Sequence, residues 1–279
     1  GTTSRDLGVP ASVQALSSPF QFNDVDSLEH QLRNDPNGFA AIILEPAGTE
    51  EPQDGFLEAI RELADRYSAM LIFDEIVTGF RTDLRGAQAK YGVTPDLACF
   101  GKSMGNGMPI AALVGQTEIM RRVEDVFFSG TFGGEALSLA AALTTIEKLE
   151  ATDGVRRNQE TGDRLKKIIG QALSHYGLRE RFDVVGPAWR PVLSVAGDGL
   201  AKTTAQSLLR QELAENGVLC AAGINICAAH DDEEILNATA ASWDKACMAV
   251  AEAYNDPNPA RHLRGKPIQP IFQVRNNGG

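Results

Sequence analysis

Short apolar runs that alternate with helical patterns are the feature that most constrains the fold of this chain of 279 residues. The runs cover Ala40–Leu44, Ala69–Phe73 and Leu97–Phe100, and apolar residues recur at helical intervals over 56–64. Continuous apolar runs of this length are typical of strands buried on both faces of a sheet. Their alternation with helices predicts an α/β fold, in which helices cover both faces of a mostly parallel sheet.

A polar residue stands at or just beyond the end of each run. Glu45 and Asp74 directly follow the first two runs, and Lys102 lies shortly after the third. Ligands of parallel sheets bind beyond the carboxyl ends of the strands. We therefore expect these three side chains to converge at one edge of the sheet.

Lys102 lies in a glycine-rich turn, Gly101-Lys102-Ser103, which leaves several roles open. It is a surface lysine, the lysine of a phosphate-binding P-loop, or an amine that forms a Schiff base with an aldehyde cofactor. The P-loop pattern needs a glycine where the chain has Asp96, which argues against that role. The nearby glycines permit the close approach of a flat ligand.

Asp74 is the partner that Lys102 would need in a pyridoxal phosphate (PLP) enzyme. A carboxylate beside the pyridine nitrogen keeps it protonated, so that the ring withdraws electrons from the substrate. Because successive strand residues face opposite ways, Glu75 is expected to point away and Ile76 to pack on the ring. The alternative is a strand-end acid that caps the following turn.

Contacts to a phosphate are predicted just before the apolar helix expected over Ala136–Leu149. Residues 129–135 read Ser-Gly-Thr-Phe-Gly-Gly-Glu. Their hydroxyls and backbone N–H groups suit a phosphate at a helix N-terminus. Ser, Thr and Gly are also ordinary helix caps, so this segment alone does not decide between the two roles.

The second half of the chain predicts a smaller α/β domain. Helices are expected over 155–176, 201–216 and 231–254, and strands at 184–185, 192–195 and 225–227. We expect part of a large domain over residues 1–153 and a small domain over 154–279, with an extended arm from Asn255 on. Arg190 is either a salt-bridged structural residue or a contact for a substrate carboxylate.

Charge and cysteine content narrow the partner classes. A formal net charge of −11 without a Lys/Arg cluster argues against nucleic acid and anionic membranes. No apolar run reaches the ~20 residues of a membrane span. The four cysteines lack C-x-x-C spacing, so neither a zinc site nor a disulfide framework is indicated. A reducing cytoplasm is the expected location.

Several motifs follow one another in residues 40–255. They are ILEP at 43–46, LIFDEIVTGFR at 71–81, TPDL at 94–97, FGKSMGNGMP at 100–109, FSGTFGG at 128–134 and NICAAHDDEEI at 225–235. In order and spacing they resemble class III aminotransferases of PLP fold type I, and most of all the glutamate-1-semialdehyde aminomutase branch.

The resemblance implies a PLP-dependent aminotransferase that takes an amino group from a small-molecule donor to a carbonyl acceptor. It implies that Lys102 forms the Schiff base and shuttles the proton, that Asp74 pairs with the pyridine nitrogen and that Ile76 packs against the ring. Gly130 and Thr131 would contact the cofactor phosphate of the neighbouring subunit, which implies a homodimer with shared active sites. An intramolecular aminomutase uses the same residues and is the alternative.

The chain departs from the family on its N-terminal side. Family members carry a long segment before the position of Gly1, with the main phosphate loop and an aromatic that stacks on the other ring face. We therefore expect the C-terminal two-thirds of an aminotransferase, one half of a split or multidomain protein, or a fragment that is inactive alone. The segment 263–270 resembles one in aminomutase-like proteins of surface-polysaccharide biosynthesis, which suggests a substrate other than glutamate semialdehyde.

Overall fold

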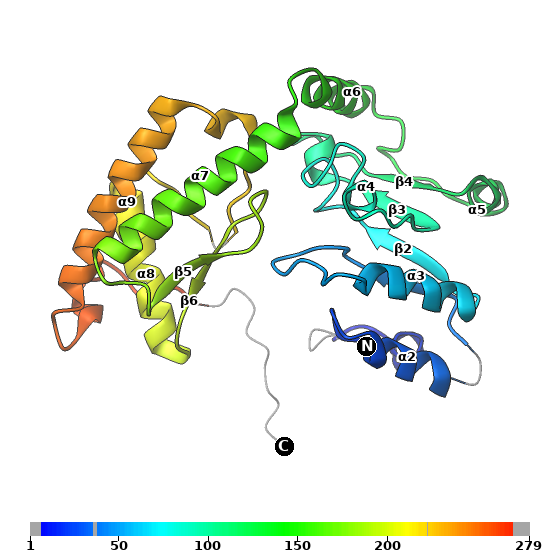
Figure 1. Cartoon of the computed structure of the whole chain (residues 1–279), viewed down its shortest axis with the longest axis horizontal. Coiled ribbons are helices and arrows are strands. Elements are labelled where there is room, and N and C mark those ends of the chain that lie inside the picture. Colours follow the sequence, from blue (N-terminus) through cyan, green and yellow to red (C-terminus); the bar gives the residue numbers. More distant parts are fainter. Residues whose placement is uncertain (1–6, 36–37, 222, 270–279) are drawn as a thin grey trace.

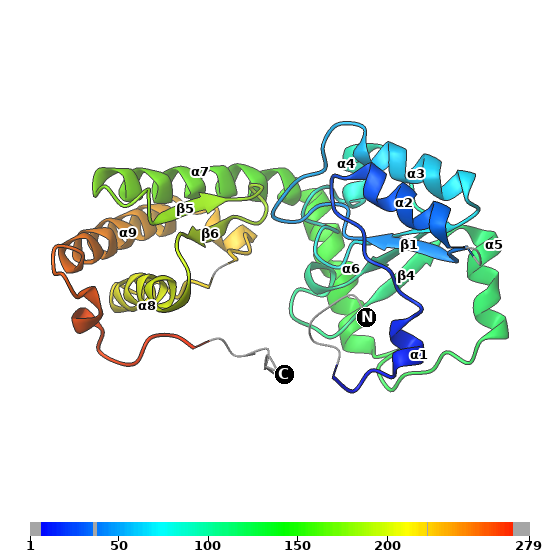
Figure 2. The same ribbon diagram turned by 90° about the horizontal axis from the view of Figure 1, so that it is seen from below.

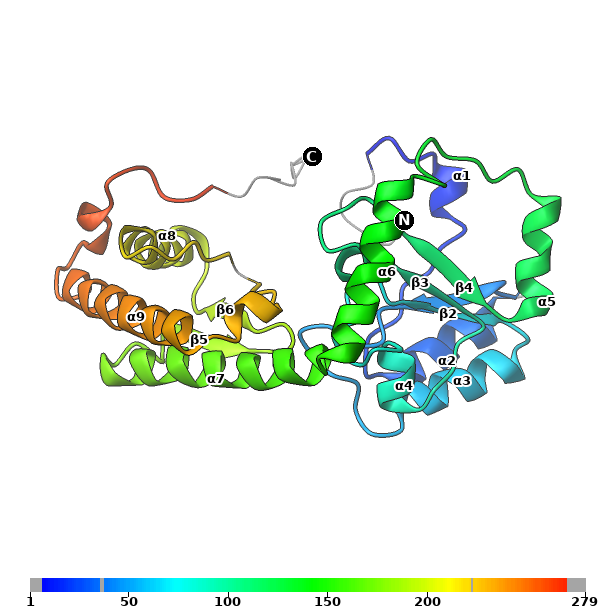
Figure 3. The same cartoon turned by 90° about the horizontal axis from the view of Figure 1, so that it is seen from above.

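The structure, a computed structural model, describes residues 7–35, 38–221 and 223–269. Figure 1 shows an N-terminal part, which contains the larger sheet, beside a C-terminal part built mainly from long helices. We use these two names for the described residues up to 151 and from 154 on. Helix α7 (Gly154–His175) starts next to the N-terminal part and runs along the C-terminal part (Figures 1 and 3).

Four strands form the sheet of the N-terminal part in the order β1-β2-β3-β4. They are β1 (Ala41–Leu44), β2 (Met70–Asp74), β3 (Leu97–Phe100) and β4 (Ala112–Gly115). The first three strands are parallel and β4 runs antiparallel to β3. This confirms the predicted mostly parallel sheet.

Helices in the N-terminal part begin where local chemistry favours a start. Asp24 caps α2 by accepting a hydrogen bond from the N–H of Ser27 (3.0 Å), and Gly55 precedes α3 with φ +83°. The helices are α1 (Ala11–Gln14), α2 (Val25–Asn34), α3 (Phe56–Arg66), α4 (Ala87–Tyr91), α5 (Thr117–Met120) and α6 (Ala136–Ala151), with the 3-10 turns η1 (Lys102–Met104) and η2 (Arg121–Asp125).

The two faces of the sheet are covered unequally. On one face, α2 and α3 pack against Ile42, Leu44, Leu71 and Phe73. On the other face, Ile43 is 59% exposed, and Ile72 and Asp74 are half-buried. The prediction of helices over both faces is therefore wrong for β1 and β2 in the described residues. Helix α6 packs instead on the end of β3, where Ala142 contacts the cluster of Phe100 and Met104.

The C-terminal part confirms the three long helices predicted there. Its elements are α7, β5 (Phe182–Val185), β6 (Val192–Val195), α8 (Gly199–Glu215), η3 (Ala228–His230), α9 (Glu233–Ala253) and η4 (Pro259–His262). Strands β5 and β6 are antiparallel. The strand predicted at 225–227 is wrong: pairing with β6 stops after an isolated bridge from Gly223 to Val192, and the chain turns into η3.

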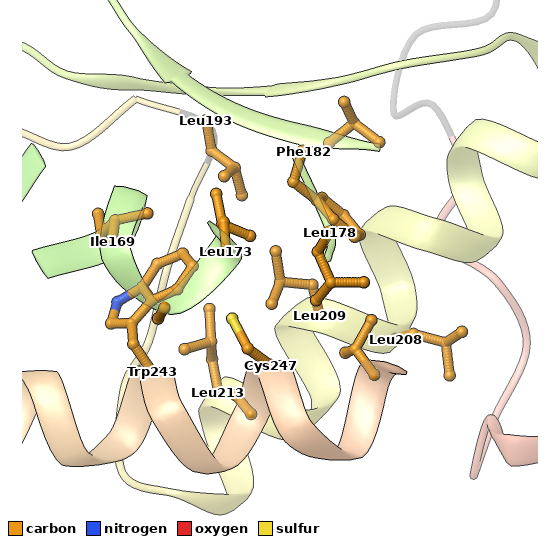
Figure 4. Packing of buried hydrophobic residues seen from close by; sticks show 14 of the residues in the cluster. Ile169, Leu173, Leu178, Phe182, Leu193, Leu208, Leu209, Leu213, Trp243 and Cys247 are labelled. Atoms are coloured by element: carbon orange, nitrogen blue, oxygen red, sulfur yellow. The ribbon is translucent and has the colours of Figure 1, made fainter. Parts of the chain in front are cut away.

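The core of the C-terminal part lies between α7, α8, α9 and the two-stranded sheet (Figures 2 and 4). Leu173 and Cys247 are 0% exposed, and Trp243 is 1% exposed. Full burial of a large apolar side chain contributes about 1.5–3 kcal/mol. In the ranges given above, no helix combines the length and apolar composition that crossing a bilayer requires.

The segment after α9 follows α8. The N–H of Arg264 donates to Gln211 Oε1 and the N–H of Ile268 donates to Ser207 Oγ, both at 2.8 Å. The predicted extended arm is thus interrupted by η4 and is hydrogen-bonded to α8 at Arg264 and Ile268. Its last residues, 270–279, lie outside the described residues.

Candidate active site

Two adjacent acids at the end of β2 face opposite sides of the sheet. Asp74 is half-buried on the face of Ile72, whereas Glu75 is 0% exposed. Asp74 Oδ1 accepts a hydrogen bond from the N–H of Ile76 (3.1 Å), as a turn cap would. Within the described chain Oδ2 has no hydrogen-bond partner, so one carboxylate oxygen of Asp74 remains available to a ligand.

Glu75 has a structural environment. It accepts hydrogen bonds from Thr78 Oγ1 (2.5 Å) and from the N–H groups of Ala87 (2.8 Å) and Gln88 (2.9 Å). The last two lie at the start of α4, where a helix favours negative charge. Gly86 leaves room for the carboxylate, because a Cβ there would lie 2.6 Å from Glu75 Oε1. The expectation that Glu75 points away from Asp74 is confirmed.

Lys102 begins the turn η1 directly after β3. Its side chain is exposed and its backbone has φ +45°, a left-handed conformation that is uncommon for a residue other than glycine. Such strain costs on the order of 1–3 kcal/mol and tends to occur at functional sites. Ser103 Oγ fixes the turn by donating to the carbonyl of Gly79 (2.8 Å).

The loop after β2 and the turn after β3 are in direct contact. A Cβ on Gly79 would lie 2.4 Å from the Phe100 ring, so only glycine permits this approach. A Cβ on Gly101 would lie 3.6 Å from Ile76 Cγ2. Strand register places Asp74 opposite Cys99, three residues before Lys102. The structure therefore brings Asp74, Ile76 and the Lys102 turn to one edge of the sheet.

Charge and exposure complete the picture of this edge. Burial and the negative charge of Asp74 raise the pKa of the neighbouring Cys99 thiol. Glu45, at the end of β1, is exposed at the same edge. With Lys102 exposed and Asp74 half-buried, this site is open to solvent in the part of the chain that the structure covers.

Gly130 and Thr131 do not join this group within the chain. Both are exposed in a turn closed by the N–H of Gly133 on the carbonyl of Gly130 (3.1 Å). The start of α6 is already capped, because the Glu135 carboxylate accepts from the N–H groups at 137 and 138 (2.8 and 2.7 Å). Those two N–H groups are therefore not free for a phosphate, whereas the phosphate contact predicted for Gly130 and Thr131 stays a prediction.

Sequence reasoning missed Arg81, which ends the LIFDEIVTGFR segment. Its half-buried guanidinium donates to the carbonyl of Val77 (2.6 Å), and burial together with the charge of Arg190 lowers its pKa. The position of Arg81 at the end of that segment was the one signal in the sequence that could have identified it, because its proximity to Arg190 depends on the tertiary fold. Arg190 is half-buried and has no salt bridge among the residues described.

Solved structures that contain PLP share this fold. The FumI protein of Sphingopyxis sp. MTA144, in its PLP form, superposes with a TM-score of 0.81 over 91% of this chain and 62% of that chain, at 25% identity. A glutamate-1-semialdehyde aminomutase of Pseudomonas aeruginosa PAO1 has a TM-score of 0.71 at 23% identity, over 87% and 58%. The architecture is thus part of the PLP-dependent transferase fold of type I.

Sequence relatives identify the family. Residues 11–186 match the family "Aminotransferase class-III". Glutamate-1-semialdehyde 2,1-aminomutase 2 of Bacillus pumilus is 33% identical over 247 residues, and 3-aminobutyryl-CoA aminotransferase of Cloacimonas acidaminovorans is 37% identical over 242 residues. Each match covers 82% of this chain and 57% of the relative. The chain belongs to the class-III aminotransferase family and spans less than two-thirds of the length of these relatives.

Proposed function

We propose that the chain carries the lysine side of the active site of a PLP-dependent aminotransferase. The observation that supports this most strongly is the contact between the Asp74–Gly79 loop and the Lys102 turn. An amine, a carboxylate with an available oxygen and the branched side chain of Ile76 meet at one sheet edge. This donor set fits the aldehyde, the ring nitrogen and one ring face of PLP.

Each of these residues has a distinct task in the proposed reaction. Lys102 holds the cofactor covalently and moves the proton at the substrate Cα. Asp74 Oδ2 would accept a hydrogen bond from the ring N–H, since its Oδ1 already accepts one from the N–H of Ile76. Bound PLP supplies an electron-withdrawing ring that stabilises negative charge at the substrate carbon. The Ser103–Gly79 bond keeps the lysine turn in place.

The rest of the assembly follows from the same proposal. Exposed Gly130 and Thr131 contact the cofactor phosphate of a second subunit, which makes the protein a homodimer with shared sites. Residues 1–153 belong to the large domain and 154–279 form the small one. A small-molecule donor and a carbonyl acceptor are the substrates, and the cytoplasm is the location.

An intramolecular aminomutase is the second candidate, favoured by the aminomutase named among the sequence relatives. The two activities differ in the fate of the amino group. An aminotransferase exchanges a ¹⁵N-labelled amino group with an external keto acid, whereas an aminomutase retains it. Product analysis by mass spectrometry therefore separates them.

Covalent attachment of PLP to Lys102 tests the proposal. The chain is incubated with PLP and gel-filtered, and its visible absorbance is compared with that of Lys102→Ala and of Lys167→Ala, an exposed lysine outside the site. We expect a protein-bound band in the parent and in Lys167→Ala that is absent from Lys102→Ala. An unchanged band in Lys102→Ala would contradict the assignment. Stoichiometric binding at micromolar PLP would contradict the idea that the chain is a fragment unable to hold the cofactor.

A further inference from the structure

Two arginines from different parts of the chain are held on one turn of α7. Gln159 Nε2 donates to the carbonyls of Arg81 (3.2 Å) and Thr82 (2.9 Å). Three residues further along the helix, Gly162 packs on the carbonyl of Ala188, so closely that a Cβ would lie 1.8 Å from that oxygen. Residues three apart share a helix face. Helix α7 therefore fixes the backbone of Arg81 and the loop of Arg190 side by side.

Among the described residues, no acid forms a salt bridge with either arginine. The salt bridges of the described residues include neither Arg81 nor Arg190. In the same residues, the guanidinium of Arg81 donates only to the carbonyl of Val77, and the guanidinium of Arg190 has no hydrogen bond. Two half-buried like charges without a counter-charge are costly. In a chain of net charge −11, such a pair indicates a site for an anion.

The pair lies next to the lysine turn. Gly79 and Phe80, just before Arg81, contact the Lys102 region through the Ser103 bond and through the Phe100 ring, whose centroid is 5.6 Å from that of Phe80. An anion held by Arg81 would thus be close to a molecule that reacts at Lys102.

We propose that Arg81 and Arg190 together bind an oxyanion, a carboxylate or a phosphate group, of the substrate that reacts at Lys102. Guanidinium groups match both oxyanions with paired hydrogen bonds, which a lysine cannot do. Because one arginine comes from each part of the chain, binding the oxyanion also joins the two parts. This inference rests on the proposed function for the identity of the ligand as a substrate.

Calorimetric titration with succinate and with inorganic phosphate tests the site, at constant ionic strength set by chloride. We expect saturable binding of at least one probe by the parent chain, and the preferred probe identifies the oxyanion. Arg81→Gln and Arg190→Gln should each weaken it about tenfold or more, as expected for loss of charged hydrogen bonds. Arg85→Gln, an exposed arginine in the same loop, is the matched control and should bind like the parent.

Arg81→Lys and Arg190→Lys keep the positive charge and control for the possibility that the Gln variants lose binding because they do not fold. Circular dichroism checks the folding of every variant. They should bind better than the Gln variants and less well than the parent. No saturable binding by the parent, or equal weakening in Arg85→Gln, overturns the inference. The result is separate from the PLP test. If PLP attaches to Lys102 but the Gln variants bind the oxyanion as well as the parent does, this site alone is refuted. If the Gln variants lose oxyanion binding but PLP does not attach to Lys102, the proposed function alone is refuted.

Discussion

The contact between Gly162 and Ala188 gives a sharp test of how α7 holds the loop of Arg190. In Gly162→Ala the new Cβ would lie 1.8 Å from a backbone carbonyl oxygen, which cannot rotate away. Ordinary contact begins at about 3.4 Å, so helix and loop must separate by roughly 1.6 Å. Overpacking of this kind costs typically 1–3 kcal/mol, and the higher helix propensity of alanine returns up to about 1 kcal/mol. Because the clash is with a backbone atom, the cost lies at the upper end of that range, and we expect a net loss of about 2 kcal/mol.

Gly170→Ala on the same helix is the matched control. Its Cβ would meet Arg179 Nη2 at 2.6 Å, but this is the end of a flexible side chain. Arg179 also pairs with Asp183, an exposed ion pair worth up to about 1 kcal/mol. The gain in helix propensity offsets that loss, so the free energy of unfolding should stay within about 0.5 kcal/mol of the parent.

Urea unfolding followed by tryptophan fluorescence measures both variants. The two tryptophans of the chain, Trp189 and Trp243, are 2% and 1% exposed and both lie in the C-terminal part. The signal therefore reports the unfolding of that part. Equal stability of Gly162→Ala and Gly170→Ala would refute the tight contact with Ala188.

Three further predictions concern titratable groups. Burial raises the pKa of Cys247 to about 12, whereas Cys227 is exposed. Iodoacetamide at pH 8 should therefore label Cys227 and spare Cys247 until urea unfolds the chain. Equal labelling rates of the two cysteines, measured by mass spectrometry, would contradict this. Glu75→Gln should lower the free energy of unfolding, measured by circular dichroism in urea, by about 2–4 kcal/mol, since buried N–H donors lose a carboxylate. The hydrogen bond from Arg157 lowers the pKa of Asp231 in the folded protein. The ionised Asp231 therefore stabilises the fold at pH values above its unfolded pKa of about 4, and this stabilisation is lost as the pH falls through its folded pKa. Asp231→Asn should therefore flatten the acid side of the stability–pH curve, and an unchanged curve would argue against the pair.

Local rules predicted the elements that depend on local patterns. Strand alternation separated Asp74 from Glu75, and continuous apolar runs located β1 to β3. The same reasoning failed at 225–227, where a short apolar pattern follows Gly223 and the chain leaves the sheet after one bridge. It also missed α5 and η2, whose mixed polar sequence has no clear period.

Features that depend on packing were beyond the reach of the sequence. The proximity of Arg81 and Arg190 is set by α7. Its Gln159 contacts the loop of Arg81, and its Gly162 contacts the loop of Arg190. No spacing along the chain links residues this far apart. Likewise, the sequence did not show that the carboxylate of Glu135 caps α6 by accepting hydrogen bonds from the N–H groups of residues 137 and 138.

The length of α7 makes the position of the Arg190 loop sensitive to the angle at which the helix starts. It starts directly after Asp153, which has a left-handed φ of +51°, and Gly162 lies about 12 Å along it at 1.5 Å per residue. A turn of roughly 5° about that start moves the Arg190 loop by about 1 Å. Displacements of this size can slow a reaction about a hundredfold. Substitutions at the start of α7 are therefore expected to alter turnover before they alter folding.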